Sequence, residues 1–401
     1  MESSNPYISL LIGLLLVSFL TAALSQYFTG TEDPNKFSGV LLENPVTDGR
    51  YKSTNLNGKR VFFSRYFKLE QGDYIELDFR TCEYNEKYNS YDKCEILIDD
   101  SKQNQFLKQI LSLRNTIISN TKLRLPSHHD VLVLAMTIGY EDDLPESLTE
   151  KLREIGAIHM LVVSGYNVSL VLNSSAVLLM RFPRWIYITS SVFLLLLFIL
   201  LTGFDAPIVR SVIMGIFIVV SKAYSRPAMA LYLLILSAIV MVSWDLTYLS
   251  NISFQLSFSA TFGVIVFGSL FASSTGTGKS SNNFVSDLVA SIGASVFVLP
   301  IISFYFGTLS FLGIASSILL GWMVPLITYL GFLTFALDWA PLKFLFVTII
   351  DLFFIIADFI AYFSFLNPEH KLHIKELVLY YIFVGMAILF VFKVKRGMTS
   401  E

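Results

Sequence analysis

The sequence predicts a polytopic α-helical integral membrane protein that carries a small β-rich domain outside the membrane. Of its 401 residues, 54% are hydrophobic and 15% are charged, whereas about 25% of residues are charged in ordinary soluble proteins. Long apolar segments fill the chain after residue 156, and a polar stretch separates them from one apolar segment at the start. The formal net charge of -2 is too close to zero to indicate a globally basic surface for nucleic acid or anionic lipid, so any such contact is local.

The first expected element is a membrane helix within residues 1–28, whose apolar run extends from Tyr7 to Phe28. The run starts without the Lys/Arg-rich segment of a secretory signal, and it exceeds the roughly 7 to 15 apolar residues of a signal core. About 20 apolar residues are the length that crosses about 30 Å of hydrocarbon. We therefore expect a retained transmembrane helix, with a cleaved signal peptide as the alternative.

A soluble domain is expected over residues 29–151, where charged and polar residues are dense. Apolar and polar residues alternate along 61–69 and 72–84, which indicates half-buried strands joined by a glycine turn. We expect a small β-barrel or sandwich, followed by helices at about 102–121 and 147–154.

Both cysteines of the chain, Cys82 and Cys94, lie in this domain on either side of a polar segment that has the composition of a hairpin loop. A disulfide between them would clip that hairpin if the domain faces an oxidising compartment. The alternative is a pair of buried or free thiols, because sequence spacing alone does not fix the geometry of a bridge.

The membrane domain is expected over residues 152–401, and with the first helix it gives about ten crossings. Pro325 lies inside the longest apolar stretch, where it can kink one helix or separate two short ones. We place the spans at 158–180, 185–203, 207–224, 228–244, 255–272, 284–304, 309–337, 343–366 and 376–394.

The orientation follows from Lys and Arg in the short loops, which are enriched on the cytoplasmic side of bacterial membrane proteins. If the stretch 309–337 crosses once, all the basic loops fall on one side, and the alternate loop 244–251 has no basic residue. We therefore expect the soluble domain outside the cytoplasmic membrane and the C-terminus in the cytoplasm. The basic residues are Arg181, Arg184, Lys222, Arg226, Lys279, Lys393, Lys395 and Arg396.

The segment from Gly156 to Val171 carries more polar residues than a membrane helix needs. His159 and Ser164 are five residues apart, which is about 140° around an ideal helix, so one straight helix does not point both at one target. A break at Gly165 would allow it. The alternative is that the small residues pack helices together and that His159 lies at the interface with water.

Two later spans also contain polar groups. Arg210 lies about one turn inside the membrane boundary, where it either pairs with Asp205 or contacts phosphate in a wet cavity. Gln255 and Ser257 lie at a helix start, where they either bond neighbouring helices or line a pore together with Arg210.

The carboxylates of Asp351 and Asp358 are seven residues apart and hence on nearly the same face of one span. Such carboxylates are candidate proton or cation sites, and the alternative partner is a lysine from a neighbouring helix. No strong metal-ligand spacing, nucleotide-binding motif or Gly-x-Ser-x-Gly elbow is present, so we expect no metal, no cofactor and no enzymatic activity.

Four stretches, in order, resemble the ComEC competence proteins, the inner-membrane channel through which naturally transformable bacteria take up DNA. The similarity covers roughly 130–330, and Asn167 stands where the family has a second histidine. The matching residues are His159, Ser164, Gly165 and Val168; Thr202, Gly203 and Arg210; Phe254, Gln255, Leu256, Ser257 and Phe258; and Pro300, Phe306, Gly307 and Ser310.

The resemblance implies an OB-like outer domain and a channel for single-stranded DNA through the lipid bilayer. It also implies a cytoplasmic helicase or translocase and DNA-receptor proteins as partners. Many members end in a metallo-β-lactamase-like domain, and this chain stops at Glu401 without one, so we expect a separate nuclease or none.

The residues expected to line or shape the DNA path are polar groups and glycines within the four matching stretches. The alternative function is a secondary transporter of a smaller solute, with Asp351 and Asp358 as proton sites. The expected path residues are His159, Ser164, Gly165, Asn167, Thr202, Gly203, Arg210, Gln255 and Ser257.

Overall fold

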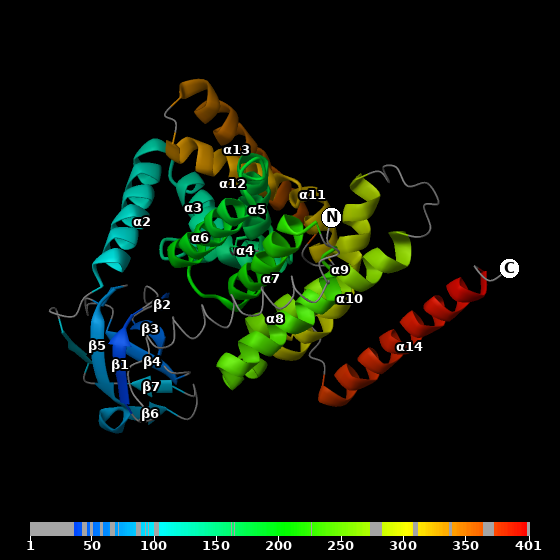
Figure 1. Ribbon diagram of the computed structural model, residues 1–401, viewed down its shortest axis with the longest axis horizontal. Helices are drawn as coiled ribbons and strands as arrows, with labels where there is room; N and C mark the ends of the chain where they lie inside the picture. The colour runs from blue at the N-terminus through cyan, green and yellow to red at the C-terminus, as the bar shows by residue number, and fades with distance from the viewer. Residues whose placement is uncertain are drawn as a thin grey trace.

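A computed structural model gives the arrangement of most of the chain (Figure 1). The first expected helix, from Tyr7 to Phe28, lies outside the described residues. The structure describes residues 36–41, 46–48, 51–56, 59–64, 69–70, 72–85, 90–92, 94, 96–99, 104–161, 163, 165–225, 227–272, 283–307, 312–336, 339–363 and 373–398.

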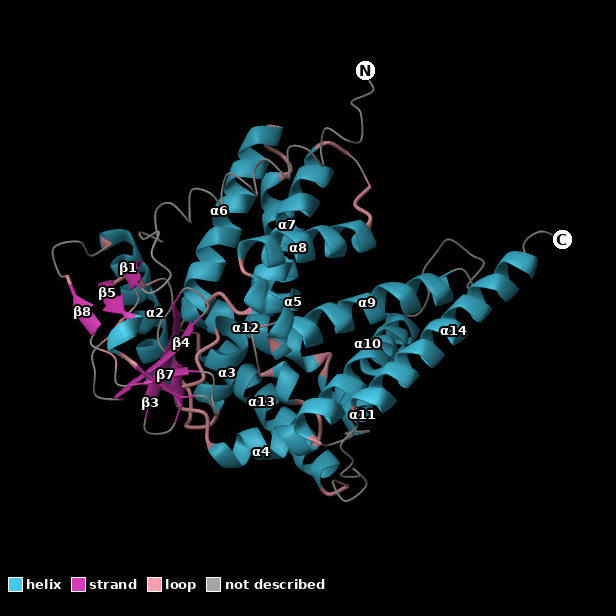
Figure 2. Ribbon diagram, turned by 90° about the horizontal axis from the view of Figure 1, so that it is seen from below, coloured by secondary structure: helices cyan, strands magenta, loops and turns pink. Residues whose placement is uncertain are grey.

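A β region precedes the helices, as the alternating sequence predicts, and lies to one side of them in both ribbon views (Figures 1 and 2). It has an antiparallel three-stranded sheet in the order β1-β5-β8 and a five-stranded sheet in the order β2-β3-β4-β7-β6, in which β4 and β7 pair in parallel. The strands are β1 (Lys36–Val40), β2 (Val46–Asp48), β3 (Tyr51–Leu56), β4 (Lys59–Ser64), β5 (Tyr74–Asp78), β6 (Glu83–Asn85), β7 (Ser90–Asp92) and β8 (Ile96–Ile98).

Alternation along β5 places its apolar side chains in the core of this region. Ile75 and Leu77 are buried, whereas Glu76 between them is exposed. Successive side chains of a strand point to opposite faces, so a two-residue period buries one face only. The half-buried strand predicted from the sequence is therefore confirmed, while an OB-like barrel stays a prediction because the described strands form two separate sheets.

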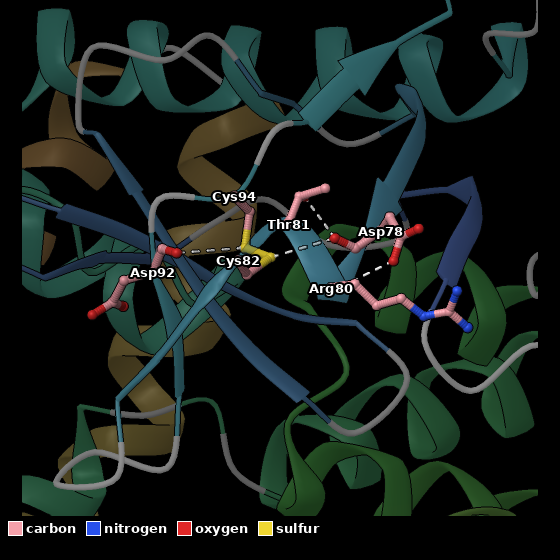
Figure 3. The surroundings of a disulfide bond; sticks show 6 residues. All are labelled: Asp78, Arg80, Thr81, Cys82, Asp92 and Cys94. Atoms are coloured by element: carbon pink, nitrogen blue, oxygen red, sulfur yellow. Dashed lines mark hydrogen bonds between the residues drawn. A yellow bond between two sulfur atoms is a disulfide. The ribbon is translucent and has the colours of Figure 1, made fainter.

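A disulfide joins Cys82 and Cys94, whose Cα atoms are 4.3 Å apart (Figure 3). The two cysteines lie at the base of the β6–β7 hairpin, in which Glu83 pairs with Asp92. The predicted hairpin and the predicted bridge are both confirmed. The turn before Cys82, a 3-10 helix over Phe79–Thr81, is capped by the Asp78 side chain, which accepts a hydrogen bond from the Arg80 backbone N–H at 3.0 Å.

Three helices lead from the β region to the membrane helices. They are α2 (Gln105–Arg124), α3 (His129–Ile138) and α4 (Glu146–Glu154), followed by a 3-10 turn at Ile158–Met160. The sequence predicts α2 and α4. It does not predict α3, because ten residues that are apolar on nearly every side show neither a helical nor a strand period.

The remaining helices agree with most of the expected spans. Their apolar composition and length are those of a multi-pass membrane protein. The helices are α5 (Gly165–Leu179), α6 (Arg184–Thr202), α7 (Ala206–Ala223), α8 (Ala230–Trp244), α9 (Ile252–Ala272), α10 (Asn283–Phe306), α11 (Leu312–Leu320), α12 (Met323–Ala336), α13 (Ala340–Ala361) and α14 (Ile374–Met398), with a 3-10 helix at Leu246–Ser250 between α8 and α9.

Six of the helices in the described part of the chain are long and apolar enough to cross a membrane, or seven if the bent pair α11 and α12 forms one span. About ten crossings therefore stays a prediction. The pair is bent by 46° at Gly321 and Trp322, and not at Pro325 as expected. Pro325 falls in the first turn of α12, where its missing N–H breaks no hydrogen bond.

The helices enclose two buried apolar clusters. One is built from α5, α6, α7 and α8 with the start of α9, and the other from α3, α4, α11, α12 and α13. Helix α10 packs along α9 and also contacts α14, on the side of the helical body away from the β region (Figures 1 and 2). Because α3 and α4 contribute to the second cluster, they belong to the helical body, although they precede the membrane spans in the chain.

Helices α9 and α10 cross at two glycines. A Cβ atom added at Gly263 would fall 2.1 Å from the carbonyl oxygen of Gly293, which is far inside the contact distance. Small residues at such crossings let membrane helices approach closely.

We expect Gly263→Ala to separate α9 from α10 and to lower the thermal unfolding midpoint of the detergent-solubilised protein. Overpacking of this kind costs about 1–3 kcal/mol. Gly268→Ala on the same helix is the matched control, because a Cβ atom there meets nothing within 4 Å. Equal midpoints for the two variants would contradict the crossing.

Candidate functional site

The centre of the candidate site is Arg210, which lies on the second turn of α7 inside the helical body. Its side chain is buried, with 9% of its surface exposed. Its Nε atom donates a hydrogen bond to the Ser257 hydroxyl oxygen on α9 at 2.8 Å. Its Nη1 atom lies 3.5 Å from the Met214 sulfur, and the Phe258 ring centre lies 5.8 Å from its Cζ atom. Helices α7 and α9 thus hold the guanidinium from two sides.

No carboxylate contacts Arg210 among the residues that the structure describes. The expected alternative, an ion pair with Asp205, is not formed; Asp205 is the N-cap residue of α7, one turn earlier. A hydroxyl, a thioether and an aromatic ring solvate a cation without neutralising it. Because an unpaired charge within membrane helices is costly, such residues mark sites for ions or charged substrates.

Gly165 brings the first turn of α5 against Arg210. A Cβ atom added at Gly165 would fall 2.4 Å from the Ser211 hydroxyl oxygen and 3.3 Å from Nη2 of Arg210. Helix α5 begins at Gly165, so His159 on the preceding 3-10 turn is not part of the same helix. Ser164 lies outside the described residues.

Asn167 connects α5 to α3. Its side chain is 2% exposed, and its Nδ2 atom donates a hydrogen bond to the Met136 carbonyl oxygen at 2.6 Å. Its Oδ1 atom is buried and has no hydrogen-bond partner within the described structure. A buried acceptor without a donor is rare in native proteins and indicates a missing partner such as water or a ligand.

The other expected path residues make local structural bonds. The Thr202 hydroxyl donates to the Phe198 carbonyl oxygen at 2.8 Å, and Gly203 ends α6 with a φ of 110° that favours glycine. The Gln255 Nε2 atom donates to the Leu249 carbonyl oxygen at 2.8 Å, on the 3-10 helix before α9.

The structure therefore brings together three of the expected residues, Gly165, Arg210 and Ser257. Sequence reasoning overlooked Met214 and Ser211. Met214 lies four residues after Arg210 on one helix face, and this i to i+4 spacing could have identified it. Ser211 could not have been found, because its role comes from the approach of α5.

The two membrane carboxylates both have basic partners from the helices that precede the membrane domain. Asp351 lies 2.8 Å from Nε2 of His129 on α3, and Asp358 accepts a hydrogen bond from Nζ of Lys151 on α4 at 2.5 Å. A lysine partner was the alternative expected from the sequence. These pairs fix α13 against α3 and α4.

Acidic side chains gather in sequence and space near the turn between α6 and α7. Partial burial raises the pKa of Asp205, and burial followed by the charges of Asp205 and Asp142 raises the pKa of Glu141. Ionisation of these carboxylates therefore costs stability at neutral pH, and solvent reduces this cost because both residues are exposed at the surface. In the described part of the chain, no group of three His, Cys, Asp or Glu side chains is placed to hold a metal ion.

We expect Gly165→Ala to lower the thermal unfolding midpoint, because the new methyl group meets the Ser211 hydroxyl. Adding Ser211→Ala removes the clashing oxygen and leaves the Ser211 Cβ atom 3.4 Å away, an ordinary contact. The double variant is expected to regain much of the loss relative to Gly165→Ala. Additive losses in the double variant would contradict the close approach of α5 and α7.

We expect Glu141→Gln to raise the unfolding midpoint at about pH 8. The folded-state pKa of Glu141 lies above its unfolded value, so ionisation costs stability above the folded pKa, and this cost disappears as the carboxyl protonates. The gain over the unmodified protein should therefore shrink as the pH falls toward about 4. If the gain in unfolding midpoint grew on acidification, the folded-state pKa of Glu141 would lie below its unfolded value, which would contradict the prediction.

Comparison with known proteins shows the family to which the chain belongs. A family model described as "Competence: Competence protein" matches residues 136–394, which is more than half of the chain. A similar protein is "ComE operon protein 3" of Bacillus subtilis (strain 168), 29% identical over 268 residues, or 64% of this chain and 32% of that protein. The matched part is thus about a third of the relative's length. No solved structure matches the chain. The match over most of the membrane helices, including the site around Arg210, shows that this chain belongs to the competence protein family.

Proposed function

We propose that this protein is a channel for single-stranded DNA, which it passes across the bacterial cytoplasmic membrane during natural transformation. The observation that carries the proposal is Arg210, a buried cation with no carboxylate contact in the described structure, held between α5, α7 and α9. Membership of the competence family and the apolar helices support a role in DNA uptake at a membrane.

Passage of a polyanion needs a site that attracts phosphate without retaining it. Arginine pairs with phosphate oxygens through several N–H groups, and each such contact is strengthened where water is scarce. A single guanidinium with neutral neighbours meets both needs, because successive phosphates can replace one another on it. Ser257 holds the Nε atom of Arg210 and Met214 lies beside Nη1, so a phosphate would bond the Nη2 side of the guanidinium, next to Gly165.

We further propose that His159, Ser164, Asn167 and Gln255 line or shape the path. The unpartnered Oδ1 atom of Asn167 supports this role, since a polar atom that lacks a protein donor is suited to bind water or a base edge. The β region would lie outside the cell as an OB-like domain, and its disulfide suits an oxidising compartment.

The protein would act without chemistry of its own. Because the 401-residue sequence has no nucleotide-binding motif, a cytoplasmic helicase or translocase would supply the force, and DNA-receptor proteins would deliver the substrate. The alternative, a proton-coupled transporter, is less favoured because Asp351 and Asp358 have basic partners that explain their presence.

We expect Arg210→Ala to lower the transformation frequency about 10- to 100-fold, the loss expected for about 1.5–3 kcal/mol of charge-assisted hydrogen bonding. Arg210→Lys should retain part of the activity. Lys222→Ala, at the exposed end of α7, is the control and should transform normally. Normal transformation by Arg210→Ala at normal protein level would rule out the proposed phosphate contact.

A further inference from the structure

A cleft lies where the end of α2 meets the junction of α12 and α13, apart from the site at Arg210. In Figure 1, the upper end of α2 reaches this junction. The Arg124 Nη1 atom donates a hydrogen bond to the Thr334 carbonyl oxygen at 2.9 Å, which joins the two walls. The cleft is lined by Ile117, Asn120, Thr121, Arg124, Leu125, Thr334, Phe335, Trp339 and Lys343.

The polar residues of the cleft suit an anion. Two of the lining residues are cations, Arg124 and Lys343, and the described lining includes no carboxylate. Lys343 has no ion pair among the described residues. The Asn120 amide and the Thr121 hydroxyl add hydrogen-bonding groups to the same cleft. A phosphate group placed here would meet positive charge from both walls.

The cleft is also at the level where lipid headgroups are expected. Trp339 immediately precedes α13, one of the helices able to cross a membrane, and is 63% exposed. Exposed tryptophans at the ends of membrane helices lie among the headgroups. Directly after Lys343, Phe344 and Leu345 are 78% and 52% exposed, so an apolar surface continues from the cleft along α13.

Helix α2 has the composition of a helix that lies on a charged membrane surface. Its 20 residues include four cations and no Asp or Glu, together with the exposed apolar side chains Phe106, Leu113 and Leu123. Lys108 and Lys122 pair with Asp73 and Asp143, so Arg124 at the end of α2 is the cation of this helix that lies in the cleft. The end of α2 therefore supplies one wall of a site whose other wall is the start of a membrane helix.

We propose that this cleft binds the phosphate of an anionic phospholipid, with Lys343 and Arg124 on the phosphate and the acyl chains along Phe344 and Leu345. The apolar wall formed by Ile117, Leu125 and Phe335 favours a lipid over a free phosphate, which has no apolar part to bury, and over a nucleic acid strand, which has no acyl chain to continue along Phe344 and Leu345. The site would fix α2, and with it the β region, to the membrane surface.

The test compares lipid binding of the full chain in detergent by native mass spectrometry. Purified protein is incubated with phosphatidylglycerol or with zwitterionic phosphatidylcholine of the same chain length. The unmodified protein should retain more phosphatidylglycerol than phosphatidylcholine. Lys343→Gln should reduce the retained phosphatidylglycerol about fivefold, the effect of one cation near an anionic headgroup. Lys343→Arg and the control Lys222→Gln should retain it.

Four outcomes would overturn the proposal. Lys343→Gln retains phosphatidylglycerol as well as the unmodified protein does, or the two lipids are retained equally. Inorganic phosphate at matched ionic strength removes the lipid completely, which would indicate a free-phosphate site. A single-stranded oligonucleotide displaces the lipid both from the unmodified protein and from Lys343→Arg, which would indicate a nucleic acid site.

Discussion

The need to keep a cation inside a bundle of apolar helices governs the arrangement around α7. Arg210 is buried, and its described neighbours are a hydroxyl, a thioether and an aromatic ring, none of which carries charge. Helix α9 supplies Ser257 and Phe258, and α5 approaches closely because Gly165 has no side chain. If any of these three helices moved away, the guanidinium would lose its partners or meet lipid. The positions of α5, α7 and α9 therefore depend on one another through one residue.

Helices α3 and α4, which precede the membrane domain in the chain, contact α5, α11 and α13 within it. Helix α3 is buried along nearly all of its length, and its Met136 carbonyl oxygen receives the Asn167 side chain from α5. His129 and Lys151 pair with the two carboxylates of α13, and the Ser316 hydroxyl of α11 donates to the Ile155 carbonyl oxygen at 2.7 Å. A segment that composition assigns to a soluble domain thus packs into the membrane domain at many points.

Much of this architecture is readable from the sequence, because apolar length and two-residue alternation are local properties. The strand at Ile75 and Leu77 and most membrane helices follow from them, while the Cys82–Cys94 bridge is expected because the two cysteines of the chain flank a hairpin-like loop. Ser257 beside Arg210, His129 beside Asp351 and Lys151 beside Asp358 do not, since each comes from a helix far away in the chain. Gln255 illustrates the limit: its residue type does not reveal that its amide donates to the Leu249 carbonyl oxygen on the preceding turn.

The most direct test of the central claim is photocrosslinking of DNA in transforming cells. A photoreactive amino acid replaces Phe258, beside Arg210, or Tyr362, which is 79% exposed at the end of α13. The account predicts that incoming labelled DNA crosslinks at position 258 and not at position 362. Efficient transformation without any crosslink at position 258, or equal crosslinking at both positions, would contradict a DNA path at Arg210.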